Sequence, residues 1–71
     1  MNNLLSVSEP ISTDLPDGRV VHGTLWREPR GFGFFAVEYG GNRWYDGHVY
    51  PSRDQMIAPA KAVLAKAAQT Q

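Results

Sequence analysis

The chain has 71 residues, so we expect a single small domain with a modest core. It has no cysteine, which excludes a disulfide framework and a thiolate metal site, and its first residues have neither the basic region of a signal peptide nor a membrane-spanning apolar stretch. Seven Lys and Arg balance seven Asp and Glu, which argues against a dedicated duplex binder with its strong basic patch. A cytoplasmic protein that does not enter a membrane is the simplest expectation.

Residues 1–18 are predicted to be a flexible acidic leader. They carry three acids and no Lys or Arg, which leaves residues 19–71 with seven bases against four acids, a surplus of three. Pro10 and Pro16 interrupt any regular element, and Asp17 followed by Gly18 is typical of a turn. Apolar side chains of this leader could still dock on the rest of the domain.

Residues 19–51 are predicted to form three antiparallel strands. Alternation of apolar side chains predicts strands over residues 19–26, 31–39 and 43–50. Pro29 favours a turn between the first two, and the Gly40-Gly41-Asn42 run is a strong hairpin signal before the third. The expected sheet is therefore a simple meander.

Residues 52–71 are predicted to be helical. Ser52 and Gln55 have the spacing of a helix-opening capping box, but Pro59 sits better as the first residue of a helix over 59–69. The segment is rich in Ala, with few large apolar residues, so it can cover one sheet face only. The chain is therefore expected to be an α+β protein, with a three-stranded meander and a short C-terminal helix.

Large apolar residues occur on both faces of the predicted sheet. One face is expected to form the core; it consists of Val21, Leu25, Phe35, Val37, Tyr45 and Val49. The opposite face is expected to carry Trp26, Phe32, Phe34, Trp44 and Tyr50. An aromatic face left open is typical of a binding surface. Alternatively, the sheet curls on itself or the leader covers that face.

The run Arg30-Gly31-Phe32-Gly33-Phe34-Phe35 combines a base with alternating glycine and aromatic residues. In a strand, Phe32 and Phe34 share one side, and the glycines leave both rings free for bases to stack on. The alternative is an ordinary hydrophobic strand that contains two glycines at a bend.

Residues 23–35, which include this run, resemble the opening of a cold-shock domain, and residues 46–52 resemble the second signature of that family more weakly. The resemblance covers about 30 of the 71 residues. It implies a small β-barrel that binds single-stranded RNA or DNA, with stacking residues Trp26, Phe32 and Phe34, Arg30 near phosphates, and His48 and Tyr50 at the positions of the family's Phe and His. After Pro51 an Ala-rich segment replaces the last two strands, so one chain is not expected to close a barrel.

The sequence does not predict catalysis. His22 and His48 are the only histidines, and although Asp46 lies near His48, a pair of histidines favours a sheet surface over a specific metal site. Spacing supports no Ser–His–Asp or paired-carboxylate arrangement. We therefore expect neither an enzyme nor a bound metal or cofactor.

Two functions remain open, and both control gene expression. The first is a regulator that docks its aromatic and basic sheet on a larger protein; the layout looks like small phage-encoded proteins that bind a host machine such as RNA polymerase. The second is a single-strand nucleic-acid binder of cold-shock type. The sequence favours docking narrowly and leaves open the direction of the effect and whether the chain is a monomer or a dimer. The predicted binding surface consists of Trp26, Arg27, Arg30, Phe32, Phe34, Arg43, Trp44, His48 and Tyr50.

Overall fold

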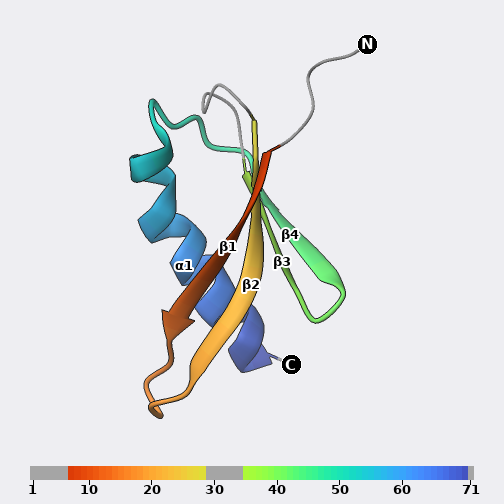
Figure 1. The fold of residues 1–71 in the computed structure, drawn as a ribbon, viewed down its shortest axis with the longest axis vertical. Coiled ribbons are helices and arrows are strands. Elements are labelled where there is room, and N and C mark those ends of the chain that lie inside the picture. Colours follow the sequence, from red (N-terminus) through yellow and green to blue (C-terminus); the bar gives the residue numbers. More distant parts are fainter. Residues whose placement is uncertain (1–6, 29–34, 71) are drawn as a thin grey trace.

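A computed structural model describes residues 7–28 and 35–70 of the chain. Four antiparallel strands form one open sheet in chain order: β1 (Val7–Asp14), β2 (Val20–Arg27), β3 (Phe35–Tyr39) and β4 (Asn42–Asp46). One C-terminal helix, α1 (Arg53–Thr70), lies across one face of this sheet (Figure 1). The α+β class, the antiparallel sheet and the single helix are confirmed, but the prediction of three strands is wrong.

The additional strand is β1, which lies in the segment predicted to be a flexible leader. It pairs with β2 along its whole length, from Val7 opposite Arg27 to Asp14 opposite Val20. Its side chains alternate, so that Ile11 is buried in the core while Pro10 is exposed. Proline is tolerated in an edge strand, where its missing N–H faces away from the sheet. Pro10 therefore does not interrupt the strand, contrary to the sequence-based expectation.

The turn between β3 and β4 follows the predicted hairpin. Tyr39 pairs with Asn42 across a two-residue loop, in which Gly40 and Gly41 have φ angles of 61° and 83°. Two consecutive positive φ angles define the type I′ turn that suits the twist of a hairpin. β4 then ends at Asp46 and does not continue to residue 50 as predicted. The strand predicted over residues 31–39 is observed as β3 from Phe35, and its first four predicted residues lie outside the described residues.

Helix α1 begins six residues before the expected start at Pro59. The Ser52 hydroxyl accepts a hydrogen bond from the Gln55 backbone N–H at 3.4 Å, as the capping signal predicts. Pro59 lies inside the helix, where it removes one backbone hydrogen bond. Met56 and Ala60, on either side of this proline, are completely buried against the sheet, and this packing compensates for the lost bond.

The core lies between α1 and the covered face of the sheet. Gly23 allows close approach, because a Cβ atom there would lie 2.7 Å from the Glu38 carbonyl oxygen and 2.8 Å from Leu64 Cδ1. Four of the six predicted core residues, those on β2 and β3, are buried as expected. The main members of the core are Ile11, Leu15, Val21, Leu25, Phe35, Val37, Met56, Ala60 and Leu64.

The other two predicted core residues, Tyr45 and Val49, are 69% and 74% exposed. The two-residue turn places Trp44, and not Tyr45, opposite Val37. Since directly paired residues share a face, Trp44 lies on the covered side and Tyr45 on the open side. Val49 follows the end of β4 and has no place in the sheet. A shift of one residue in the hairpin register explains the error at Tyr45.

Candidate functional site

The face of the sheet that points away from α1 is called the open face here. Strand pairing places alternate residues on it, beginning with the row of Ser8, Trp26, Ala36 and Tyr45. Among residues 7–28 and 35–70, no helix or strand covers this face (Figure 1). It consists of Ser8, Pro10, Ser12 and Asp14 from β1, Val20, His22, Thr24 and Trp26 from β2, Ala36 and Glu38 from β3, and Arg43 and Tyr45 from β4.

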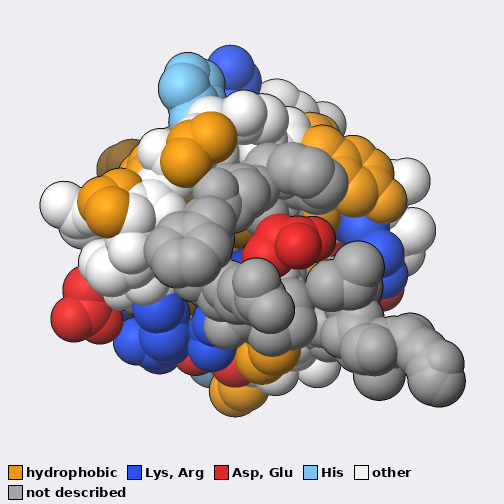
Figure 2. Space-filling view, turned by 90° about the horizontal axis from the view of Figure 1, so that it is seen from above, with side chains coloured by type: hydrophobic (Ala, Val, Ile, Leu, Met, Phe, Trp, Pro, Cys, Tyr) orange, Lys and Arg blue, Asp and Glu red, His pale blue; other side chains and the backbone are white. Residues whose placement is uncertain are grey.

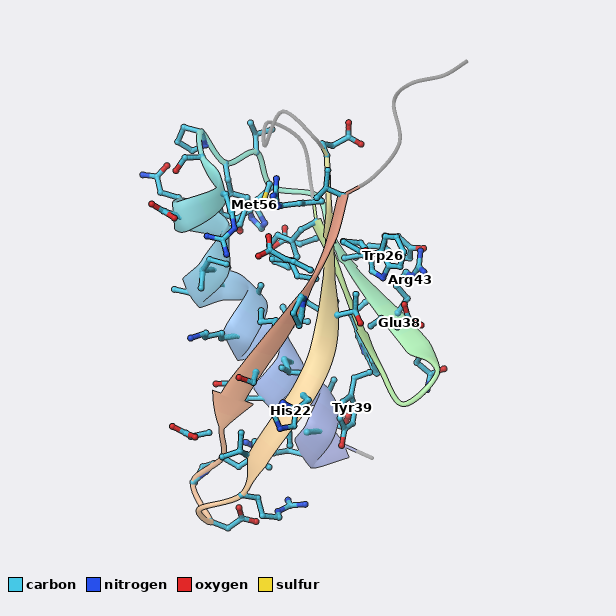
Figure 3. All side chains as sticks on the ribbon, in the orientation of Figure 1. His22, Trp26, Glu38, Tyr39, Arg43 and Met56 are labelled. Atoms are coloured by element: carbon cyan, nitrogen blue, oxygen red, sulfur yellow. The ribbon has the colours of Figure 1, made fainter. Side chains whose placement is uncertain are left out.

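Trp26, Glu38 and Arg43 form a connected cluster on the open face (Figure 3). The Trp26 indole N–H donates a hydrogen bond of 2.8 Å to Glu38 Oε1, and Arg43 Nη2 donates one of 3.3 Å to the same oxygen. The Arg43 guanidinium carbon lies 4.7 Å from the centroid of the Trp26 ring, which is a cation–π arrangement. The three side chains thus hold one another in place on three adjacent strands.

The open face is close to neutral. Its charged side chains in the described part of the chain are Asp14, Glu38 and Arg43. Arg43 is already paired with Glu38. The end of the molecule seen in Figure 2 likewise shows acidic side chains beside basic ones, without a continuous basic surface among its coloured residues. This charge pattern suits a protein partner better than a chain of phosphates.

Arg27 belongs to a different cluster, on the covered side of the sheet. Glu9 Oε2 lies 2.8 Å from Arg27 Nε, and Glu9 Oε1 lies 2.6 Å from Arg53 Nη2. The hydrogen bonds from Arg53 and then Arg27 lower the pKa of Glu9 from 4.5 to about 2. In return, Glu9 raises the pKa of Arg53. This cluster joins β1, β2 and the start of α1, so Arg27 has a structural role and is not part of the open face.

His48 and Tyr50 belong to a third cluster, which fixes the connection between β4 and α1. Asp46 accepts a hydrogen bond of 2.7 Å from the His48 backbone N–H and one of 3.0 Å from the Tyr50 hydroxyl. The Tyr50 ring packs against Phe35, with 5.7 Å between the ring centroids. Tyr50 is therefore half-buried at the edge of the core, and its predicted place on the open face is wrong.

The pKa values of this cluster follow from its hydrogen bonds and its burial. Burial alone raises the pKa of Asp46, but the hydrogen bonds from His48 and Tyr50 outweigh it and lower the pKa below its ordinary value. Burial and then the hydrogen bond to Asp46 raise the pKa of Tyr50. Asp46 is therefore an ionised anchor for the chain that leaves β4.

Trp44 lies on the covered side of β4, which corrects its predicted place on the open face. It borders a hollow between β4 and the C-terminal half of α1. The other residues that line this hollow are Tyr45, Val63, Lys66, Ala67 and Thr70. α1 packs against β1, β2 and β3, so Trp44 is only half-buried.

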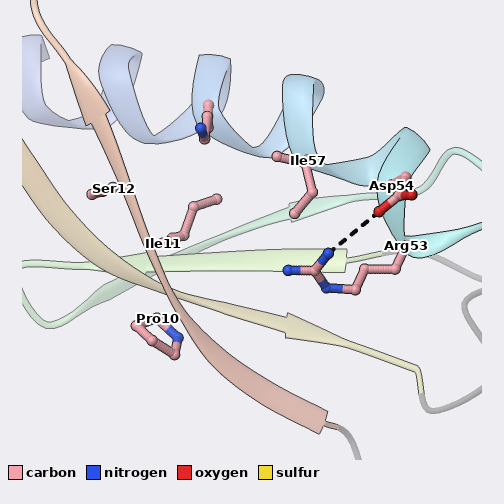
Figure 4. A pocket seen from close by; sticks show the side chains of 7 residues that line it. Pro10, Ile11, Ser12, Arg53, Asp54 and Ile57 are labelled. Atoms are coloured by element: carbon pink, nitrogen blue, oxygen red, sulfur yellow. Dashed lines mark hydrogen bonds and ion pairs between the residues drawn. The ribbon is translucent and has the colours of Figure 1, made fainter.

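A second hollow lies between β1 and the first half of α1 (Figure 4). Ile11 and Ile57 supply its apolar part, and Arg53 and Asp54 lie 3.4 Å apart beside them. Arg53 is also paired with Glu9, so its charge is engaged by two carboxylates. Across the described residues, no three His, Asp or Glu side chains come together in a way that could hold a metal ion.

The structure thus separates the predicted binding residues. It brings Trp26 and Arg43 together, assigns Arg27, Trp44, His48 and Tyr50 to other places, and does not describe Arg30, Phe32 or Phe34. Sequence reasoning did not include Glu38 among the binding residues, and it placed Tyr45 in the core instead of on the open face. The two-residue Gly40-Gly41 turn contained the signal, because it fixes which residues of β3 and β4 are paired.

The chain matches no protein-family model, no curated protein and no solved structure. α1 is not apolar enough to cross a membrane, and it is the one helix in the described part of the chain. The chemistry of the open face is therefore the main evidence for function.

Proposed function

We propose that this chain is a small non-enzymatic regulator of gene expression that docks the open face of its sheet on a larger protein. The observation that carries the proposal is the Trp26–Glu38–Arg43 cluster, together with the exposed ring of Tyr45, on a face that no described element covers. RNA polymerase is the first partner to test, because the size and layout of the chain look like those of small phage-encoded regulators.

The residue types on the open face are those that dominate protein interfaces. Trp, Tyr and Arg are enriched among residues whose truncation costs the most binding energy. Trp26 and Arg43 are also held by Glu38, so less side-chain freedom is lost when a partner binds. The cluster thus combines anchor residues with an arrangement that exists before binding.

The test compares the proteins retained by open-face variants and by a helix-face control. Trp26→Ala removes the anchor, and Thr24→Arg adds bulk and charge opposite Glu38 while Trp26, Glu38 and Arg43 themselves are unchanged. Lys61→Ala with Lys66→Ala changes two exposed residues of α1 and serves as the control. We expect RNA polymerase subunits to be retained by the wild type and the control and to be depleted at least about tenfold by either open-face variant, which corresponds to about 1.4 kcal/mol.

Purified RNA polymerase then tests the partner directly. Binding to immobilised wild-type chain, with the same loss in both open-face variants, supports the proposal. Retention of polymerase at the wild-type level by both Trp26→Ala and Thr24→Arg contradicts docking through the open face. If another protein is lost from both variants while polymerase is never bound, the open face is supported and polymerase is excluded.

One observation favours single-stranded nucleic acid as a second candidate. Arg27 pairs directly with Phe35, next to Trp26, so the two described ends of the connection that contains Arg30, Phe32 and Phe34 lie beside Trp26. Titration of the labelled chain with a short oligonucleotide at two salt concentrations tests this. Binding that weakens steeply with salt, and by about 1–3 kcal/mol when Phe32 or Phe34 becomes Ala, supports stacking. Oligonucleotide binding that changes neither with salt nor with these substitutions contradicts stacking.

A further inference from the structure

We infer that two copies of this chain form a symmetric dimer in which β4 pairs antiparallel with β4 of the second copy, centred on Trp44. The two four-stranded sheets would join into one sheet of eight strands. The inference rests on the backbone of β4 and on the chemistry of its side chains, and it does not depend on the proposed docking partner.

The two edge strands of the sheet, β1 and β4, differ in whether their outward backbone groups can pair with a strand of another molecule. The Leu15 N–H donates to the Arg19 carbonyl oxygen at 2.8 Å, which makes these two residues a hydrogen-bonded pair. Hydrogen-bonded and non-hydrogen-bonded pairs alternate along an antiparallel ladder, so even-numbered residues of β1 direct their backbone groups outward. Pro10 is one of these residues and has no N–H to offer. β1 is therefore protected against pairing in the way that natural edge strands are.

β4 has no such protection. The type I′ turn makes Tyr39 and Asn42 a hydrogen-bonded pair, and the same alternation directs the backbone groups of Arg43 and Tyr45 outward. Neither residue is proline, and the strand runs beyond the area that α1 covers (Figure 1). Among the described residues, no other segment pairs with the N–H and C=O groups of these two residues, so another strand can pair with them.

The side chains of β4 select one register. Outward-directed residues must face each other, so a two-fold axis can pass through residue 43, 44 or 45. An axis at Arg43 opposes two arginines, and an axis at Tyr45 opposes Trp44 with the Asp46 carboxylate. An axis at Trp44 places Arg43 opposite Tyr45 of the second copy, and Asn42 opposite its Asp46. Only this last register combines a cation with an aromatic ring and an amide with a carboxylate.

This register also covers the half-buried Trp44. A two-fold axis perpendicular to the sheet keeps both helices on the same face, so the two Trp44 side chains meet between them. The Trp44 ring of each copy would then close the other copy's hollow, which Val63, Lys66 and Ala67 line beside β4. The net charge of the chain is zero, so association is not opposed by overall charge repulsion.

Analytical ultracentrifugation of two proline variants tests whether the dimer forms through the edge of β4. Tyr45→Pro removes an outward N–H from β4, and Ser12→Pro makes the matched change at an outward position of β1. We expect the wild type and Ser12→Pro to sediment as dimers and Tyr45→Pro to sediment as a monomer with an unchanged circular dichroism spectrum. A wild-type chain that stays monomeric at millimolar concentration overturns the inference, as does a dimer that survives in folded Tyr45→Pro.

Cysteine cross-linking tests the register without relying on a proline variant that folds. The chain has no cysteine of its own. At the proposed axis, residue 44 faces itself as a non-hydrogen-bonded pair with Cα atoms about 4.5 Å apart, within the range for a disulfide. Trp44→Cys should therefore form a covalent dimer under mild oxidation. Arg43→Cys and Tyr45→Cys should cross-link to each other when mixed, and faster than either does alone; faster self-linking of either one overturns the register.

Discussion

The two faces of the sheet are built from the same strands and differ in almost every other respect. The covered face is apolar along its centre, with Leu25 and Val37 completely buried under α1. The open face carries Trp26, Glu38 and Arg43 in a hydrogen-bonded cluster. Because side chains alternate along a strand, neighbouring residues such as Leu25 and Trp26 perform separate tasks. Substitutions on the two faces should therefore have separable effects, on folding for the covered face and on binding for the open face.

The largest expected effect comes from the centre of the covered face. Leu64→Ala removes a completely buried side chain that reaches the sheet at Gly23 and should lower the free energy of unfolding by about 2–5 kcal/mol. Lys66→Ala, on an exposed position of the same helix, is the matched control and should change it by less than about 0.5 kcal/mol. Urea unfolding followed by circular dichroism measures both. Similar values for the two variants would contradict the proposed core.

The ion-pair cluster at the end of the covered face should have the next largest effect. Glu9→Gln removes the charge that pairs with Arg27 and Arg53 and should cost about 1–3 kcal/mol at pH 7. The pKa of Glu9 is about 2 in the folded chain, below the ordinary value of 4.5. Its stabilising contribution is thus fully present above about pH 4.5 and is lost as the pH falls towards 2.

Urea unfolding of the wild type and Glu9→Gln between pH 7 and pH 2 checks this pH dependence. The difference in free energy of unfolding between the two proteins should shrink as the pH falls through this window. A difference that stays constant would show that the Glu9 charge does not stabilise the fold.

The hairpin turn, which sets the register of β4 on both faces, should have a smaller effect. Gly41 has a φ angle of 83°, so Gly41→Ala should cost about 1–2 kcal/mol through backbone strain. Gly47 has no neighbouring atom within 4 Å and no positive φ angle, so Gly47→Ala is the control and should be close to neutral. Equal unfolding midpoints in urea for these two variants would argue against the type I′ turn.

The smallest expected effect on folding is that of the open-face cluster. Glu38→Gln weakens its ion pair with the partly exposed Arg43 and should lower the free energy of unfolding by less than about 1 kcal/mol. The amide oxygen can still accept the Trp26 indole N–H, whose NMR signal should shift only slightly. A loss as large as that of Leu64→Ala would mean that the open face also supports the core, and the comparison between the faces would fail.

Much of this architecture could be predicted from the sequence because its signals are local. Alternation located β2, and Gly40 with Gly41 identified the hairpin. The missing strand, β1, could not be found in the same way, because Pro10 is acceptable only at an outward position of an edge strand, and edge position is a tertiary property. The start of the helix was predicted too late, at Pro59, for a similar reason. The burial of Met56 and Ala60 against the sheet, which is a tertiary property, compensates for the backbone hydrogen bond that Pro59 removes.

The candidate site was harder to predict than the fold. Alternation and residue type identified Trp26 and Arg43 as binding residues. The faces of β4 depended on the hairpin register, and an error of one residue exchanged Trp44 with Tyr45. The ion pair of Arg27 could not be anticipated, because its partner Glu9, which also pairs with Arg53 at the start of α1, is distant in sequence. Ion pairs between distant segments leave no local pattern.

The most direct test of the central claim is binding of purified RNA polymerase to the wild type, to Trp26→Ala and to the helix-face control Lys61→Ala with Lys66→Ala. If the chain docks through the open face, polymerase binds the wild type and the control equally and binds Trp26→Ala at least about tenfold more weakly, while Trp26→Ala keeps the wild-type circular dichroism spectrum. Equal binding to all three proteins would contradict docking through the open face, and absence of binding to the wild type would exclude polymerase as the partner.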